Sequence, residues 1–113
     1  MRRDDEEHRE QVKLVRWFEL QFPEVRMLAI PNGGNRNLIT AKKLKAEGVR
    51  RGVPDLQVPA WNLWIEMKKT KGGRTSPEQK QWIEYLRAIG HTVFVCAGFH
   101  EARQMILEIQ EAR

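Results

Sequence analysis

The chain has 113 residues, of which 41% are hydrophobic and 31% charged, with a formal net charge of +5 at pH 7. These values are typical of one globular domain, so we predict a single domain over residues 1–113. No apolar run approaches the roughly 18 residues that a membrane helix needs, and the charged first ten residues are unlike a signal peptide. We therefore expect a cytoplasmic protein with no membrane partner. The excess of cations favours a partner that carries many negative charges.

The first predicted element is a helix over residues 5–21, which Pro23 ends. Side chains recur on one face at spacings of three and four, as in an amphipathic helix. That face is predicted to cover the core and comprises Glu7, Gln11, Val15, Phe18 and Phe22. Glu10 is predicted to point elsewhere, along the line through residues 14, 17 and 21.

The central region is predicted to alternate strands and turns with one short helix. Residues 25–30 form a short buried strand, and the turn PNGG follows at 31–34. Residues 38–47 form a helix that Gly48 ends. Two further strands, 53–59 and 62–69, are joined by a tight turn that contains Trp61. The ring of Trp61 is interpreted either as packing against a helix or as available to a ligand.

The last third is predicted to be helix, strand, helix. Ser76 is the N-cap and Pro77 the first helical residue of a helix over 76–89. Its predicted inner face comprises Trp82, Ile83, Leu86 and Ile89. A strand over 91–97 and a helix over 100–112 follow, and the helix between the strands implies that they run parallel. The fold class is therefore α/β, with a mixed sheet flanked by helices in the order α β α β β α β α.

Two carboxylates and a lysine lie in the predicted hairpin. Glu66 and Lys68 alternate along one strand and so share a face, and Asp55 follows Pro54 on the neighbouring strand. In a hairpin Asp55 and Glu66 converge. Glu66 and Lys68 alone are also compatible with a solvent-facing sheet edge, so the convergence of Asp55 is what favours a functional site.

Converging carboxylates repel each other unless a cation lies between them. Oxygen ligands of this kind suit Mg²⁺ or Mn²⁺, which can polarise a phosphoryl oxygen and lower the pKa of a bound water. Lys68 could orient the attacking water or offset charge on the phosphate, and Glu7 could reach the same ion from the first helix. The chemistry that this set predicts is phosphodiester hydrolysis.

The motif PD at residues 54–55 with EMK at 66–68 resembles the PD-(D/E)XK nuclease signature. Together with IPNGG, GVPDL, GGRTSPEQKQW and LRAIGHTVFVC, it resembles the VRR-NUC family (virus-type replication-repair nucleases), of the stand-alone phage and bacterial type, over about residues 7–102. The resemblance implies a restriction-endonuclease-like core. The implied catalytic residues are Asp55, Glu66, Lys68, Glu7 and Gln79. The implied metal ligands are Asp55, Glu66, Glu7 and the backbone carbonyl of Met67.

Several assignments leave alternatives open. Glu6 or Glu10 could replace Glu7, because the first helix begins with several acids. Gln79 could be a plain helix-surface residue, and Asn32 could be a turn residue with no further role. The cationic clusters could likewise be solvated surface. Their functional interpretation is DNA binding by Asn32, Arg36, Lys42, Lys43, Arg51, Lys69, Lys71 and Arg74.

The resemblance also implies partners and substrates. The expected activity is that of a Mg²⁺- or Mn²⁺-dependent DNA endonuclease that acts on branched DNA, similar to Holliday-junction resolvases, as a homodimer in a bacterial or phage-infected cell. One alternative is a non-catalytic DNA-binding module that has retained the nuclease fold. Others are a flap nuclease or a restriction-type nuclease, although a chain of this length has little room for base-reading insertions.

Overall fold

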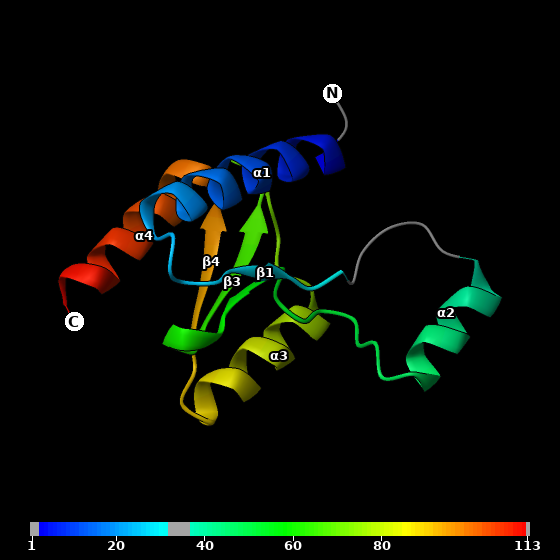
Figure 1. Ribbon diagram of the computed structural model, residues 1–113. Helices are drawn as coiled ribbons and strands as arrows, with labels where there is room; N and C mark the ends of the chain where they lie inside the picture. Colours follow the sequence, from blue (N-terminus) through cyan, green and yellow to red (C-terminus); the bar gives the residue numbers. More distant parts are fainter. Residues whose placement is uncertain (1–2, 32–36, 113) are drawn as a thin grey trace.

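The computed structural model describes residues 3–31 and 37–112, with side chains from residue 6 onward. Its order of helices and strands confirms the predicted one (Figure 1). The elements are α1 (Arg3–Gln21), β1 (Leu28–Ala29), α2 (Leu38–Ala46), β2 (Leu56–Val58), the 3-10 turn η1 (Pro59–Trp61), β3 (Leu63–Lys68), α3 (Pro77–Ala88), β4 (Thr92–Ala97) and α4 (Phe99–Glu111).

The strands form one mixed sheet in the order β1-β2-β3-β4. β1 pairs antiparallel with β2, and β2 pairs antiparallel with β3, which confirms the predicted hairpin. β3 and β4 pair in parallel along their whole length, from Leu63 opposite Thr92 to Lys68 opposite Ala97. This parallel pairing follows from the crossover through α3, as the sequence predicted.

Helices cover both faces of the sheet. Leu14 and Phe18 of α1 and Ile106 of α4 pack against Ile65 and Met67 of β3 on one face. On the other face a smaller cluster joins α3 to β4, formed by Ile83, Leu86 and Val93 with Trp64, Trp82 and Val95 packed against it. Glu66 and Lys68 alternate with Ile65 and Met67, so their side chains leave the strand on the side of α3.

The buried stripe of α1 differs from the predicted one. Leu14 and Phe18 are fully buried and Glu10 is 9% exposed, whereas Val15 is only half-buried. The prediction that Glu10 points away from the core is therefore wrong. With 3.6 residues per turn, the buried stripe of α1 runs through residues 10, 14 and 18. Glu10 remains inside because its carboxylate finds hydrogen-bond partners there.

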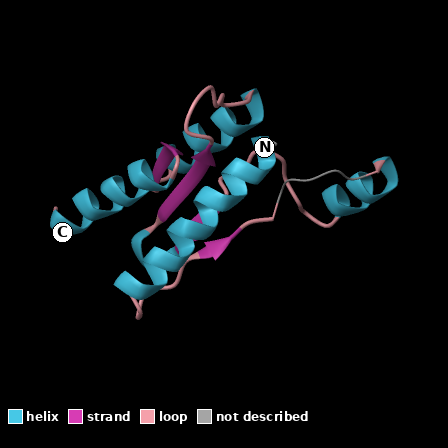
Figure 2. Cartoon of the chain, turned by 90° about the horizontal axis from the view of Figure 1, so that it is seen from above, coloured by secondary structure: helices cyan, strands magenta, loops and turns pink. Residues whose placement is uncertain are grey.

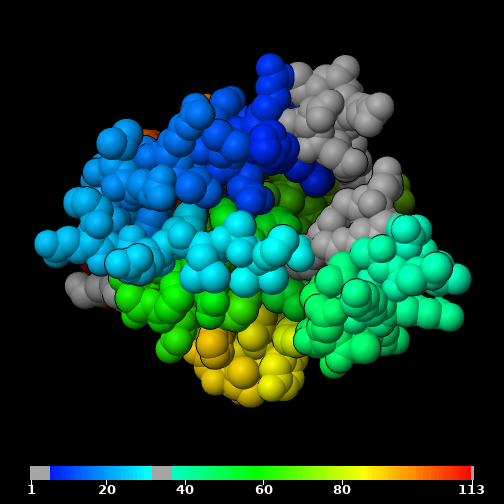
Figure 3. Space-filling model, turned by 45° about the vertical axis from the view of Figure 1, so that its right-hand side comes forward, coloured from blue at the N-terminus to red at the C-terminus, as the bar shows by residue number. Residues whose placement is uncertain are grey.

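Two predicted core positions lie at the surface. The expected buried strand over 25–30 is a two-residue edge strand, and Leu28 is 42% exposed. Figure 3 shows the cyan segment around it lying on the surface beside the blue atoms of α1. Ile89, expected on the inner face of α3, is 54% exposed because it is the C-cap residue, where the helix has already ended.

Trp61 packs its ring against Phe18 and Phe22, at centroid distances of 5.5 and 5.2 Å.

α2 stands apart from the sheet and from the other helices (Figures 1 and 2). Asn37 caps its first turn by accepting a hydrogen bond from the Thr40 amide, and Gly48 follows its end with a φ of +103°. No residue of α2 is buried, and Leu38 and Ile39 are 70% and 80% exposed.

None of the helices in residues 3–31 and 37–112 combines the length and apolar character that crossing a membrane requires.

Candidate active site

The hairpin register brings Asp55 and Glu66 together. Leu56 pairs with Ile65, so the next position back on β2 and the next position forward on β3 are Asp55 and Glu66. Directly opposed residues in an antiparallel pair project to the same face with their Cβ atoms about 5 Å apart. The two carboxylates therefore share the α3 face of the sheet, as the sequence predicted.

The local contacts hold both acids in place. Asp55 Oδ2 accepts a hydrogen bond of 2.8 Å from the Met67 amide, which ties the start of β2 to the end of β3. Glu66 is only 3% exposed on an interior strand, which excludes a solvent-facing sheet edge. Burial, then the charge of Asp55 and a hydrogen bond with it, raise the pKa of Glu66 to about 9. Burial also raises the pKa of Asp55 above its ordinary value.

A shared proton follows from these raised pKa values. Two carboxylates in one buried place cannot both ionise without a compensating cation. Near neutral pH and without a metal, the pair therefore retains one proton between Asp55 and Glu66. A cation between the two carboxylates would compensate their charge in place of that proton.

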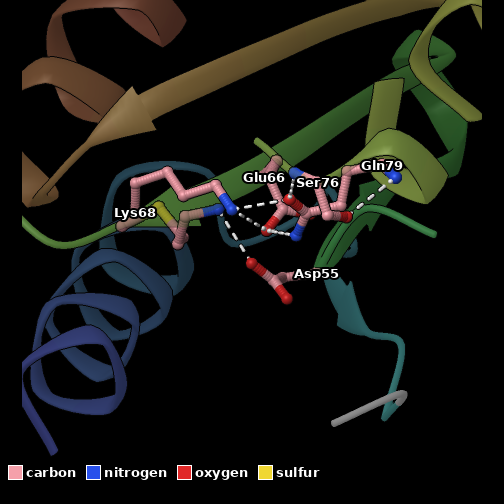
Figure 4. A network of polar contacts seen from close by, with 6 residues as sticks. Asp55, Glu66, Lys68, Ser76 and Gln79 are labelled. Carbon is pink, nitrogen blue, oxygen red and sulfur yellow. Dashed lines mark hydrogen bonds and ion pairs between the residues drawn. The ribbon is translucent and has the colours of Figure 1, made fainter. Parts of the chain in front are cut away.

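Lys68 and Gln79 complete a polar network with Glu66 (Figure 4). Lys68 Nζ donates a 2.7 Å hydrogen bond to Gln79 Oε1 and lies 3.7 Å from Glu66 Oε2. Gln79 Nε2 donates a 3.1 Å hydrogen bond to the same Glu66 oxygen. Gln79 is thus no plain helix-surface residue, because its amide holds the lysine with one end and the glutamate with the other.

The start of α3 explains how Gln79 reaches this position. Ser76 and Gln79 form a capping box: the Gln79 amide donates to Ser76 Oγ at 3.2 Å, and the Ser76 amide donates to Gln79 Oε1 at 2.8 Å. Pro77 occupies the first turn, where its missing N–H costs no hydrogen bond. The sequence predicted the cap through Ser76 and Pro77. It gave no sign that the Gln79 oxygen that completes the cap would also accept from Lys68.

Glu6, Glu7 and Glu10, the three candidate acids of α1, have different surroundings. Glu6 accepts hydrogen bonds from both the amide and the hydroxyl of Thr70, at 2.9 and 2.7 Å. Glu10 accepts from the Phe99 amide at 3.0 Å and from Lys13 at 2.9 Å, and so caps the start of α4. Glu7 has a buried carboxylate oxygen, and its charge contributes to raising the pKa of Glu66. Of the three, Glu7 is the acid whose charge acts on Glu66.

The donor set fits a small hard cation bound by few protein ligands. Within residues 3–31 and 37–112, no three His, Cys, Asp or Glu side chains are grouped so that they would hold a metal by themselves. Mg²⁺ usually keeps several waters and needs only one or two carboxylates, which Asp55 and Glu66 supply. Without a metal, the retained proton compensates part of the negative charge of the pair. A bound cation would supply that positive charge instead.

The cationic residues lie in two separate places. Lys42 and Lys43 are exposed on α2, and Arg51 is exposed in the segment that leads to Asp55. Asn32 and Arg36 lie outside the described residues. Lys71 and Arg74 are exposed in the loop between β3 and α3, and Lys69 is half-buried there. This loop borders a hollow of about 200 Å³ whose lining includes Lys68, Lys69, Thr75 and Glu101.

Comparisons of the sequence and of the structure with known proteins both find the VRR-NUC domain. The sequence profile of the VRR-NUC domain matches residues 5–100. A solved structure described as a VRR_NUC domain protein is similar to this chain with a TM-score of 0.77 and 27% sequence identity, over 91% of this chain and 86% of that one. No curated protein matches the chain.

Proposed function

Because the chain belongs to the VRR-NUC family of nuclease domains, we propose that it is a divalent-metal-dependent DNA endonuclease that hydrolyses phosphodiester bonds. The observation that carries the proposal is the meeting of Asp55, Glu66 and Lys68 on one face of the sheet, with both carboxyl pKa values raised. A structural ion pair would need one acid and one base. A second buried acid lowers the stability of the fold unless it coordinates a cation.

In this proposal Asp55 and Glu66 hold Mg²⁺ or Mn²⁺, with the Met67 backbone carbonyl as a further ligand. Glu7 acts from α1, which suits a role through a metal-bound water. When bound, the ion supplies positive charge to the phosphoryl oxygens and lowers the pKa of a coordinated water. The Met67 amide fixes the orientation of Asp55, so the carboxylate is already aimed before the ion arrives.

Lys68 and Gln79 contribute positioning and charge. Lys68 as a residue is only 7% exposed, so its charge is poorly screened by solvent and would act strongly on a phosphate placed beside Glu66. It can orient the attacking water or balance the charge that develops on the phosphate. Gln79 holds the ammonium in a single direction through the 2.7 Å hydrogen bond.

The proposed substrate is branched DNA, and the proposed assembly is a homodimer. α2 and the loop between β3 and α3 each offer exposed cations to a DNA backbone. A two-fold dimer would present two active sites, as paired cuts on a four-way junction require. A bacterial or phage-infected cytoplasm is the setting that suits this activity.

Cleavage of defined DNA structures tests the proposal. Wild-type protein is incubated with single-stranded, duplex, flap, fork and four-way-junction DNA, with Mg²⁺, Mn²⁺ or EDTA, and the cuts are mapped. We expect metal-dependent cleavage, with the junction cut fastest. Flap-specific or sequence-specific cutting would identify the flap or restriction-type alternative.

The variant Asp55→Ala is expected to lose cleavage and Mn²⁺ binding by calorimetry while melting cooperatively. Glu84→Ala, which removes an exposed acid of α3, is the control and should leave both unchanged. DNA binding without cleavage by the wild type under all metals would support the non-catalytic module. Full activity in Asp55→Ala would remove Asp55 from the site.

A further inference from the structure

We propose that Gly52 is a positioning residue of the active site: its missing side chain lets the segment between α2 and β2 rest on the first turn of α3, which fixes Gln79 beside Lys68 and Glu66. The inference rests on the proposed function and adds a residue to it. The nearest atoms that a side chain at position 52 would meet belong to Glu78 and Gln79, so its effect on the reaction passes through Gln79.

The contact is between backbones. A Cβ on Gly52 would lie 2.6 Å from the carbonyl carbon of Glu78, 2.8 Å from its oxygen and 2.7 Å from the amide nitrogen of Gln79. Such distances are shorter than any side chain tolerates, and the atoms involved belong to a helix that cannot yield as a flexible side chain would. Any residue other than glycine at position 52 must therefore displace the peptide that joins Glu78 to Gln79.

That peptide is the one that aims the Gln79 side chain. Its nitrogen donates to Ser76 Oγ in the capping box, and the side chain beyond it bonds Lys68 at 2.7 Å and Glu66 at 3.1 Å. These hydrogen bonds tolerate little displacement, because each weakens steeply as donor and acceptor separate. A displacement of the first turn of α3 therefore releases the ammonium from its fixed direction.

Gly48 provides a matched control in the same segment. Both glycines have positive φ, +103° at Gly48 and +86° at Gly52, so alanine strains the backbone at either position. A Cβ on Gly48 meets no atom within 4 Å. The pair Gly52→Ala and Gly48→Ala therefore separates the contact with α3 from the backbone conformation alone.

The first readout is steady-state cleavage of the preferred DNA. We expect Gly52→Ala to lower kcat by about 10- to 100-fold with KM changed less than twofold, because a misplaced catalytic group affects the chemical step rather than DNA binding. Gly48→Ala should retain kcat within about twofold. In a Gln79→Ala background, Gly52→Ala should add little further loss, because the two changes act through one side chain. An equal loss of kcat in Gly48→Ala and Gly52→Ala, or independent losses in the double variant, would overturn the proposal.

The second readout needs no activity. The side-chain amide of Gln79, assigned by its absence in Gln79→Ala, should shift towards the position of a free glutamine amide in Gly52→Ala and stay in place in Gly48→Ala, in NMR spectra of metal-free protein. An unshifted resonance in Gly52→Ala overturns the positioning role. Because this result does not depend on cleavage, an inactive wild type would count against the nuclease proposal alone.

If Gly52→Ala fails to melt cooperatively, Gly52→Asn and Gly48→Asn replace the alanine pair. Asparagine tolerates positive φ better than alanine but still carries a Cβ. The same readouts then apply. A folded Gly52→Asn variant with wild-type kcat and an unshifted Gln79 resonance would overturn the proposal.

Discussion

Lys68 has an amide oxygen rather than a carboxylate as its nearest partner. The ammonium donates to Gln79 Oε1 at 2.7 Å, while the nearest Glu66 oxygen is 3.7 Å away. A neutral acceptor directs the ammonium without cancelling its charge, as a close carboxylate would. The charge of Lys68 therefore remains available to a phosphate.

Removing that charge should abolish the reaction without unfolding the protein. We expect Lys68→Ala to lower kcat by at least about 100-fold at saturating metal, a loss typical of a missing acid–base or charge-stabilising group. Thermal melts check the fold. Lys80→Ala is the control, because Lys80 is an exposed lysine of α3 with no assigned role in the site, and it should retain kcat within a few-fold. A Lys68→Ala enzyme as active as Lys80→Ala would contradict the assigned role.

The raised pKa of Glu66 predicts how metal-free stability depends on pH. The folded protein keeps its proton up to about pH 9, whereas the unfolded chain releases it near the ordinary value of 4.5. The neutral form stabilises the fold below pH 4.5, and this contribution is lost as pH rises towards 9. In EDTA, the melting temperature should therefore fall between pH 5 and pH 9.

The variant Glu66→Gln tests this dependence because its amide cannot ionise. We expect a flatter pH profile and, at pH 8 in EDTA, a melting temperature at least about 4 °C above wild type, which corresponds to about 1 kcal/mol in a domain of this size. Mn²⁺ should raise the melting temperature of wild type and leave Glu66→Gln nearly unchanged. Parallel pH profiles for the two proteins would show that Glu66 is ionised in the fold.

Local signals in the sequence were enough to predict the helix α3 and the hairpin. Ser76 and Pro77 define a helix start by chemistry that needs no distant partner, and the alternation from Trp64 to Lys68 defines which side chains share a face. The approach of Asp55 to Glu66 followed from the hairpin alone. These are short-range patterns, and the structure confirms them.

Other features depended on packing between distant segments. Glu10 is buried because the start of α4, 89 residues away, supplies the Phe99 amide. Periodicity alone could not decide between Leu14 and Val15 for the core, because each fits a helical stripe. The prediction that Leu28 is buried was wrong for a similar reason. Leu28 lies on an edge strand, where one side of the sheet has no neighbouring strand.

α2 presents its lysines without contributing to the core. We expect the triple variant Lys42→Ala, Lys43→Ala, Lys45→Ala to reduce the slope of log K against log salt by about 0.9 for each lysine that contacts a phosphate, up to about 2.7. The midpoint of thermal unfolding should change little, since no residue of α2 is buried. Lys80→Ala on α3 is the control for a cation elsewhere. An unchanged slope in the triple variant would exclude α2 from the DNA interface.

At the scale of the whole molecule, the mixed sheet places its polar site between unlike strands. Asp55 comes from the antiparallel side, through β2, and Gln79 from the crossover between the parallel strands β3 and β4. Glu66 and Lys68 lie on β3, where the two kinds of pairing meet. The antiparallel side also holds the backbone of Asp55, because the amide of Ile30, the residue after β1, donates a 2.7 Å hydrogen bond to the Asp55 carbonyl oxygen.

The proposed homodimer makes a prediction about how cuts are coupled. A mixed dimer of wild-type and Asp55→Ala protomers, isolated through two different affinity tags, should nick one strand of a four-way junction and fail to make the paired cut. Wild-type dimers isolated in the same way are the control and should make both cuts. A single mass corresponding to the monomer in light scattering, at concentrations where the junction is resolved, would contradict the dimer.

The separation of α2 from the remainder of the fold gives the molecule two surfaces under different physical constraints. Substitutions at exposed helix positions usually alter the free energy of unfolding by less than about 0.5 kcal/mol, whereas changes among the packed side chains of the sheet are far more disruptive. In the proposed DNA interface, successive changes of charge along α2 would retune which polyanions are held, and how tightly, while the groups of the candidate site keep their places. Affinity and chemistry are free to diverge at different rates within one short chain.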